Sequence, residues 1–292
     1  MEKNLTAGSV SKNLIMFSLP YLLSYFLQTL YGMADLFIIG QFEGVDSTTA
    51  VSIGSQIMHM LTVMIVGLAM GTTVSIGQAV GAGDRKKASK NVGNTIILFM
   101  TVSVFLTVFL LVSVRPIVSV MSTPTEAVDD TVKYLIVCFI RIPFITAYNI
   151  ISSIFRGIGD SKSPMYFIAI ACIANIGLYY LFMGVFLLGP VGAALGTTVS
   201  QAISVIISLF VIVKRKSIIL NSTDLKPCRN VIGKILKIGI SIALQDGLIQ
   251  IAFIIITVIA NHRGLDDAAA VIQWHPCSIK NCLYLSFIDM KS

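Results

Sequence analysis

Long apolar runs separated by short polar segments make up most of the chain. A helix needs about 20 residues to cross the hydrocarbon core of a bilayer, and each run reaches that length. The pattern therefore predicts seven transmembrane helices joined by short connections. They span roughly residues 14–40, 50–79, 92–114, 132–155, 164–188, 191–213 and 236–260. The first run is too long for a signal peptide, and no small-residue cleavage site follows a short apolar core.

The composition agrees with a chain whose surroundings are mostly lipid. Hydrophobic residues make up 55% of the chain and charged residues only 12%, whereas a soluble domain carries about 25% charged residues. The five cysteines form no C-x-x-C pair, so neither a zinc site nor a disulfide framework is indicated. We therefore expect an all-α integral membrane protein that has membrane lipid as its partner.

The basic residues define the orientation of these helices. If the N-terminus is cytoplasmic, the basic segments at 85–90 and 214–237 fall inside, and up to residue 271 only Arg115, Lys133 and Arg263 fall in outer segments. Cytoplasmic loops of membrane proteins are enriched in Lys and Arg. The net charge of +7 is thus explained by topology. We expect a multi-pass protein of the cell membrane with a cytoplasmic N-terminus and no nucleic-acid partner.

An internal repeat accompanies the seventh run. Residues 42–51 (FEGVDSTTAV) and 262–271 (HRGLDDAAAV) share Gly, Asp, Ala and Val at matched positions, and each stretch follows an apolar run. Parallel repeats related by an axis along the membrane normal are a known plan of transporters. The seventh run is therefore interpreted as a second copy of the first.

The tail after Val271 does not continue the repeat. Residues 272–292 hold the only Trp and two of the five Cys, and they are too short and too polar to span a membrane. The interpretation is that the chain stops early and that this tail is read out of frame. A genuine, divergent extracellular tail is the alternative.

Four polar or glycine-rich stretches stand at the ends of the predicted helices. They are DLFIIG at 35–40, QAVGAGDRKKA at 78–88, FRGIGDSKSP at 155–164 and GPVGAALGTTVSQ at 189–201. In this order they resemble the multidrug and toxic compound extrusion (MATE) family of antiporters, over roughly residues 10–271. That family has twelve helices in two six-helix lobes, so the resemblance implies one lobe and one further helix here.

The resemblance also implies a domain organisation. The four expected parts are an N-terminal six-helix lobe at 1–213, a cytoplasmic inter-lobe loop at 214–235, the first helix of an incomplete second lobe at 236–271, and the tail at 272–292. Two such chains associating with each other would imitate the whole protein, so self-association is an expected partner interaction.

Asp35 is the first candidate functional residue, because it lies near the end of an apolar run. Ionisable residues within membrane helices usually face a cavity and serve function. A carboxyl group there can exchange a proton, or hold Na⁺ through its oxygens when ionised. The alternative is a carboxylate that simply reaches the outer aqueous phase. The family's first-helix acid stands at this motif, and no cofactor other than H⁺ or Na⁺ is expected.

The rest of the expected cation site departs from the family pattern. Asn175 and Tyr179 are four residues apart, hence on one helix face. The stretch resembles the family's N-x-x-L-D, but Tyr179 takes the place of the acid and is uncharged near pH 7. Thr197 would add a hydroxyl, although a helix-packing threonine is equally consistent with the sequence. The departure puts cation coupling in doubt.

Four further residues are candidates for a substrate cavity. Gln28 precedes Asp35 by seven residues, and Tyr31 and Tyr148 offer aromatic rings that attract cationic ligands. Arg141 lies within the fourth run, two residues before Pro143, and suggests a bent helix beside a cavity. The alternative for Arg141 is a side chain that extends toward the interface.

These features favour an antiporter that exports lipophilic, often cationic drugs. A non-transporting remnant and a flippase for lipid precursors remain alternatives. A membrane-embedded aspartyl protease is not expected, although residues 157–160 read G-I-G-D. Asp160 lies in a cytoplasmic loop, and that chemistry needs two carboxylates at catalytic depth.

Overall fold

The computed structural model describes residues 10–42, 45–120, 128–215 and 224–262, and this part of the chain is helical apart from short turns, without a strand. The predicted all-α class is therefore confirmed for the described residues. The elements are α1 Val10–Phe42, α2 Val45–Gly81, α3 Arg85–Val112, α4 Val114–Val120, α5 Val128–Ile140, α6 Ile142–Gly157, α7 Lys162–Tyr179, the π-helix η2 Tyr180–Val185, α8 Gly189–Arg215 and α9 Arg229–His262.

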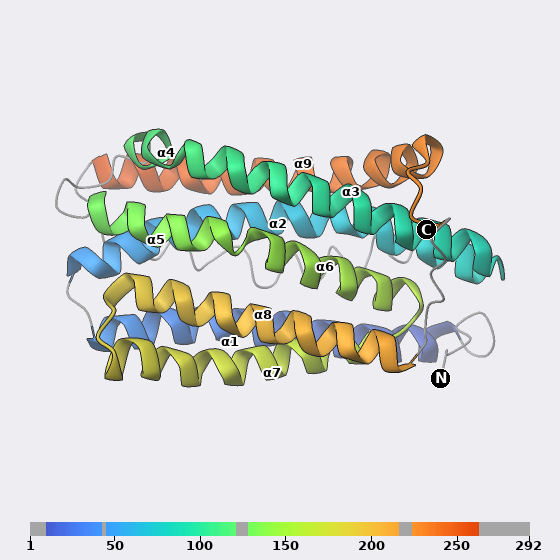
Figure 1. The fold of residues 1–292 in the computed structure, drawn as a ribbon, viewed down its shortest axis with the longest axis horizontal. Helices are drawn as coiled ribbons and strands as arrows, with labels where there is room; N and C mark the ends of the chain where they lie inside the picture. The colour runs from blue at the N-terminus through green and yellow to red at the C-terminus, as the bar shows by residue number, and fades with distance from the viewer. Residues whose placement is uncertain (1–9, 43–44, 121–127, 216–223, 263–292) are drawn as a thin grey trace.

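The long helices run roughly parallel to one another along the length of the molecule (Figure 1). In this view α1, α7 and α8 lie at the bottom, α3 and α9 at the top, and α2, α5 and α6 between them. The most extensive contacts join α2 to α9, α7 to α8 and α2 to α6, while α1 packs chiefly on α7. Apolar side chains from these helices form the core between the layers.

Five of the described helices are long and apolar enough to cross a membrane, and a sixth span forms if α5 and α6 are taken together across their 41° bend. They correspond to the second to seventh predicted runs. The first run falls within the continuous helix α1, whose side chains are described only in part. The protein is thus a multi-pass membrane protein.

The predicted bend in the fourth span is confirmed. The helix is interrupted at Arg141, and Pro143 occupies the first turn of α6. Proline has no N–H to donate and its ring clashes with the preceding turn, so an α-helix cannot continue through it unbent. Arg141 itself is buried at this interruption.

Helices extend into two polar segments that were expected to be loops. Residues 80–91 were predicted as a loop, but α3 already begins at Arg85, because the Asp84 carboxylate caps it by accepting from the Lys87 N–H at 2.9 Å. Likewise α9 begins at Arg229, inside the predicted inter-lobe loop 214–235. Hydropathy detects where a helix leaves the bilayer and not where the helix ends.

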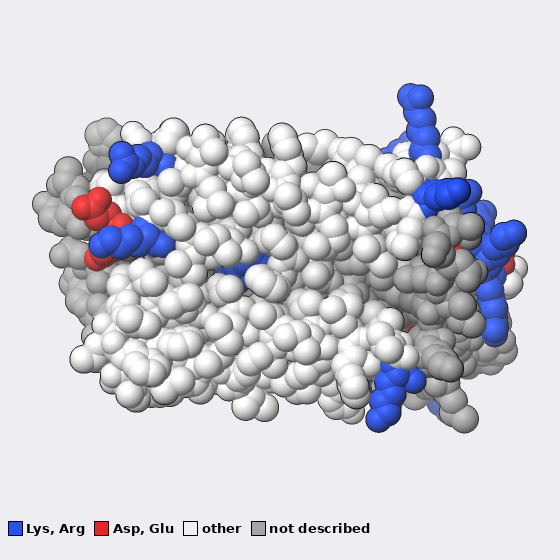
Figure 2. All heavy atoms as spheres, viewed as in Figure 1, with Lys and Arg blue, Asp and Glu red and all other residues white. Residues whose placement is uncertain are grey.

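Most charged side chains gather at the two ends of the molecule, and the wide belt between them is nearly free of charge on this face, apart from one small basic patch (Figure 2). The end at which α3 and α9 begin carries the basic segments, and the opposite end carries Asp129 and Asp130 with Arg115 and Lys133. This distribution is the one that the predicted orientation requires.

Small residues allow α9 to lie directly on the backbone of α2. A Cβ atom added to Gly71 would meet the Ile235 carbonyl oxygen, and one added to Gly239 would come within 2.5 Å of the Leu68 carbonyl oxygen. At Gly67 an added Cβ would lie 2.8 Å from Cα of Ala243. Small residues spaced four apart permit such close approach between membrane helices.

The start of α9 is also fixed to α3. The side chain of the buried Asn94 donates through Nδ2 to the Asp224 carbonyl at 3.5 Å and accepts from the Cys228 N–H at 2.5 Å. Lys234 of α9 donates to Oε1 of Gln78 in α2 at 2.7 Å. Residues 224–228 are therefore held against the end of α3 that carries the basic residues.

Cys228 should react as a thiolate at unusually low pH. Hydrogen bonding from the Val231 backbone at the start of α9 lowers the pKa of its thiol, and Lys90 adds to the effect. Because the thiolate is the nucleophile, alkylation should persist at pH values where an ordinary cysteine is protonated. We expect the rate of maleimide labelling, measured with Cys277 and Cys282 replaced by serine, to rise at a lower pH than the rate of glutathione labelling does.

The remaining cysteines and a second lysine supply the controls for this labelling. Cys138 and Cys172 are buried and should stay unlabelled in the folded protein. Lys90→Ala should move the profile upward, whereas Lys86→Ala should not. An unshifted profile, or equal effects of the two lysine variants, would contradict the expectation. In oriented vesicles the reaction also reports which membrane face carries Cys228.

Candidate functional site

Three of the residues predicted for cation binding lie together between α7 and α8. The Asn175 side chain donates through Nδ2 to the Thr197 hydroxyl at 3.4 Å, and the hydroxyls of Tyr179 and Thr197 are 3.1 Å apart. Thr197 gives its single proton to the Ala193 carbonyl, 3.0 Å away. Tyr179 is therefore the donor in its bond with Thr197. All three side chains are buried.

This cluster is neutral and tightly filled. The Tyr179 ring is 1% exposed, and Gly196 makes room for it, since a Cβ there would lie 3.0 Å from ring atom Cδ2. A hard cation favours carboxylate and carbonyl oxygens, and the cluster contributes no carboxylate. Within the described ranges no group of three or more His, Cys, Asp or Glu side chains is placed to hold a metal ion.

Asp35 and Tyr31 are part of α1, but their side chains lie outside the described residues. Their assignment to the cation site and to the substrate cavity therefore stays a prediction.

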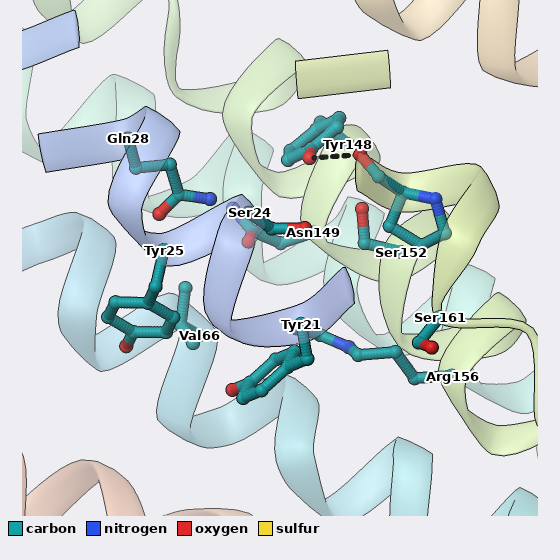
Figure 3. A pocket seen from close by; sticks show the side chains of 11 residues that line it. Tyr21, Ser24, Tyr25, Gln28, Val66, Tyr148, Asn149, Ser152, Arg156 and Ser161 are labelled. Carbon is teal, nitrogen blue, oxygen red and sulfur yellow. Dashed lines mark hydrogen bonds between the residues drawn. The ribbon is translucent and has the colours of Figure 1, made fainter. Parts of the chain in front are cut away.

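A small hollow, partly open to the outside, lies between α1, α2, α6 and the start of α7 (Figure 3). Gln28 and Tyr148, both predicted for a substrate cavity, contribute to its wall. The full lining is Tyr21, Ser24, Tyr25, Gln28, Val66, Tyr148, Asn149, Ser152, Arg156, Ser161 and Pro164.

Side chains alone connect α1 to α6 across this hollow, because among the described residues no Cα atom of α1 lies within 8 Å of one in α6. The Arg156 guanidinium is 5.3 Å from the centroid of the Tyr21 ring, and its Nη2 donates to the Ser153 hydroxyl at 3.1 Å. Tyr148 donates to the Pro164 carbonyl at 3.4 Å, which joins α6 to α7 (Figure 3).

The hollow and the neutral cluster are separate sites. Pro164 lines the hollow near the start of α7, and Asn175 lies eleven residues further along, which is about 17 Å of helix. Arg141, predicted to face a cavity, is buried at the interruption between α5 and α6 and does not belong to the hollow's wall.

Sequence reasoning missed most of the wall, although a signal was present. Tyr21, Ser24, Tyr25 and Gln28 recur at intervals of three, one and three residues, which places them on one face of a helix. In α6, Asn149, Ser152 and Arg156 follow one another at intervals of three and four residues, which also places them on one helix face. A polar stripe along an otherwise apolar transmembrane helix indicates an interior or cavity-facing side.

Comparison with known proteins adds sequence relatives. Residues 20–181 match the sequence profile of the MatE family. The chain is 31% identical over 259 residues to the probable multidrug resistance protein YpnP of Bacillus subtilis, covering 89% of this chain and 58% of YpnP. It is 25% identical over 262 residues to the multidrug export protein MepA of Staphylococcus aureus, covering 87% of this chain and 57% of MepA.

The fold is similar to solved transporter structures. A MOP superfamily transporter from Pyrococcus furiosus superposes with a TM-score of 0.83 at 26% identity, covering 91% of this chain and 59% of that one. A multidrug resistance MATE family transporter in an outward-facing conformation gives a TM-score of 0.82, also at 26% identity and with the same shares of the two chains covered. The chain thus spans 58% or less of the curated relatives described above. It belongs to the MatE family, which is a family of membrane transporters and not of enzymes.

Proposed function

We propose that the chain forms part of a multidrug exporter in the cell membrane, which moves lipophilic, often cationic compounds out of the cell in exchange for H⁺ or Na⁺. The observation that carries the proposal is the similarity, along 89% of the chain, to a protein named for multidrug resistance. The N-terminus would be cytoplasmic, in keeping with the basic end of the molecule.

The proposed organisation follows the family's two-lobe plan. Residues 1–213 form one lobe, 214–235 connect it to the next, 236–271 begin a second lobe, and 272–292 are a separate tail. The chain spans 58% of the length of its relative YpnP, and export in a two-lobe plan would use a central cleft between two lobes. A second copy of this chain is the proposed partner.

Cation coupling would depend on Asp35. Of the four residues assigned to the cation site, Asn175, Tyr179 and Thr197 are uncharged near neutral pH, so Asp35 alone supplies a group that changes charge. Asp35 would take up a proton from the outside and release that proton to the inside, which would return the lobe to the state that accepts drug.

Purified full-length chain in liposomes tests the proposal through ethidium efflux driven by an imposed proton or sodium gradient. We expect Asp35→Asn to abolish gradient-driven efflux, because asparagine cannot exchange a proton or carry a charge. Asp84→Asn is the matched control, since Asp84 caps α3 at the surface and asparagine is an equally good N-cap. It should transport like the unaltered chain.

Each of the other possible outcomes of the efflux experiment would support a different function. Full activity of Asp35→Asn would remove Asp35 from the coupling mechanism. Absence of efflux in every form, with either gradient, would make the chain a non-transporting remnant. Movement of a labelled lipid precursor without ethidium efflux would make it a flippase.

A further inference from the structure

We propose that the hollow between α1, α2 and α6 binds the anionic head group, a phosphate or carboxylate, of an amphipathic molecule, with Arg156 as the main contact. The proposal does not depend on export activity, because it concerns equilibrium binding. It differs from the cationic-drug site that the sequence suggested.

The charge of the wall favours an anion. Its eleven residues include one cation, Arg156, and no carboxylate (Figure 3). In the described part of the chain no acidic oxygen lies within 4.0 Å of the Arg156 guanidinium. The ion pair present among the described residues joins Lys133 to Asp130, at the other end of the molecule. The carboxylate of Asp160, four residues on, accepts from the backbone N–H groups of Lys162 and Ser163. A cationic ligand would find no carboxylate in this wall to offset its charge.

Arg156 retains hydrogen-bonding capacity for such a ligand. A guanidinium has five N–H donors in a fixed fork that matches carboxylate and phosphate oxygens. Among the described residues only its Nη2 meets a protein acceptor, Ser153, and its buried Nε meets none. The Tyr21 ring beneath the guanidinium holds it in place, so an incoming oxygen encounters a largely fixed donor.

The other lining residues suit an oxyanion that carries an apolar tail. Buried hydroxyl groups come from two segments, with Ser152 on α6 and Ser161 just before α7, whereas the Ser24 hydroxyl of α1 already donates to the Pro20 carbonyl. A phosphate has several acceptor oxygens and can accept from such groups at once. Tyr25 and Val66 add apolar surface for the part of the ligand next to the head group.

The depth of the hollow fits a lipid of the cytoplasmic leaflet. Arg156 ends α6 at the basic end of the molecule, where the head groups of that leaflet would lie. From there the wall rises along α1 through Tyr25 to Gln28, toward the apolar belt. Contacts between α1 and α2 are few, so this side of α1 is only loosely covered by α2. A soluble amphipathic anion would satisfy the same chemistry.

The test is thermal unfolding of the purified full chain in nonionic detergent with added dioleoylphosphatidylglycerol. We expect the midpoint to rise by about 3–6 °C at ten times the dissociation constant. Dioleoylphosphatidylcholine, with the same acyl chains and no net charge, should give little change. The gain should disappear in Arg156→Gln, be partly kept in Arg156→Lys, and remain in Lys162→Gln, which removes an exposed cation from the same end.

Two further probes distinguish the source of the anion. A shift with octyl phosphate equal to that with the phospholipid would identify a soluble amphipathic anion, and a shift with the phospholipid alone would identify a lipid head group. Equal shifts with the two phospholipids would overturn the proposal. So would an undiminished phosphatidylglycerol effect in Arg156→Gln. The comparison of the two lipids needs no variant, so it holds even if Arg156→Gln fails to fold.

Discussion

Replacing Tyr179 with alanine is expected to lower the free energy of unfolding by about 3–5 kcal/mol, the range for truncating a buried aromatic residue. The ring is almost completely buried and packs in the same core as Met183, Ala193 and Ala194. Its loss leaves a void against Gly196 and removes a hydrogen bond to Thr197. Chemical or thermal unfolding in detergent measures the change.

Tyr180 is the matched control because it is the next residue and is 47% exposed. Tyr180→Ala should change the free energy of unfolding little, since little contact area is lost. Tyr179→Phe separates the hydroxyl from the ring and should cost about 0.5–1.5 kcal/mol, the usual net value of a hydrogen bond. If Tyr179→Ala were no more harmful than Tyr180→Ala, the packing described for the cluster would be wrong.

Gly239→Ala is expected to lower the free energy of unfolding by about 1–3 kcal/mol, as overpacking a close contact does. Even one methyl group at this position would meet the Leu68 carbonyl oxygen, 2.5 Å away. That neighbour is backbone and cannot turn aside as a flexible side chain would. Unfolding in detergent and protease resistance of α9 provide the measurements.

Gly233 in the same helix gives a control of opposite sign. A Cβ there meets no atom within 4 Å, so Gly233→Ala should be neutral or stabilise by up to about 1 kcal/mol through helix propensity. Gly71→Ala, on the facing helix, should behave like Gly239→Ala because its added Cβ would meet the Ile235 carbonyl oxygen. Equal behaviour of Gly233→Ala and Gly239→Ala would show that α9 does not rest on α2 in this manner.

The sequence was sufficient to predict the membrane spans, since burial in lipid imposes a length and an apolar composition on each of them. It also predicted the bend near Arg141, because proline acts locally on its own helix. The meeting of Asn175, Tyr179 and Thr197 followed from the family resemblance. The spacing of residues along the sequence could not predict that Asn175 and Tyr179 of α7 contact Thr197 of α8.

The hollow was not predicted, for a physical reason. Its wall combines residues from Tyr21 to Pro164 that no local pattern connects. Only packing decides that α1 rests on α7 while side chains alone link it to α6. Arg141 shows the converse: its sequence context resembles that of a cavity residue, and the bend places it in the interior instead.

The contact between α2 and α9 has a consequence for how it could separate. Side chains that interlock over several ångströms can slide while staying in touch, but here the backbones themselves meet at Gly71 and Gly239. An extra separation of about 0.5–1 Å already removes a quarter to a half of the dispersion attraction, so a small separation weakens this contact strongly. Separation of α2 from α9 is therefore expected to be abrupt, because the close backbone contact at Gly71 and Gly239 is lost over a short distance.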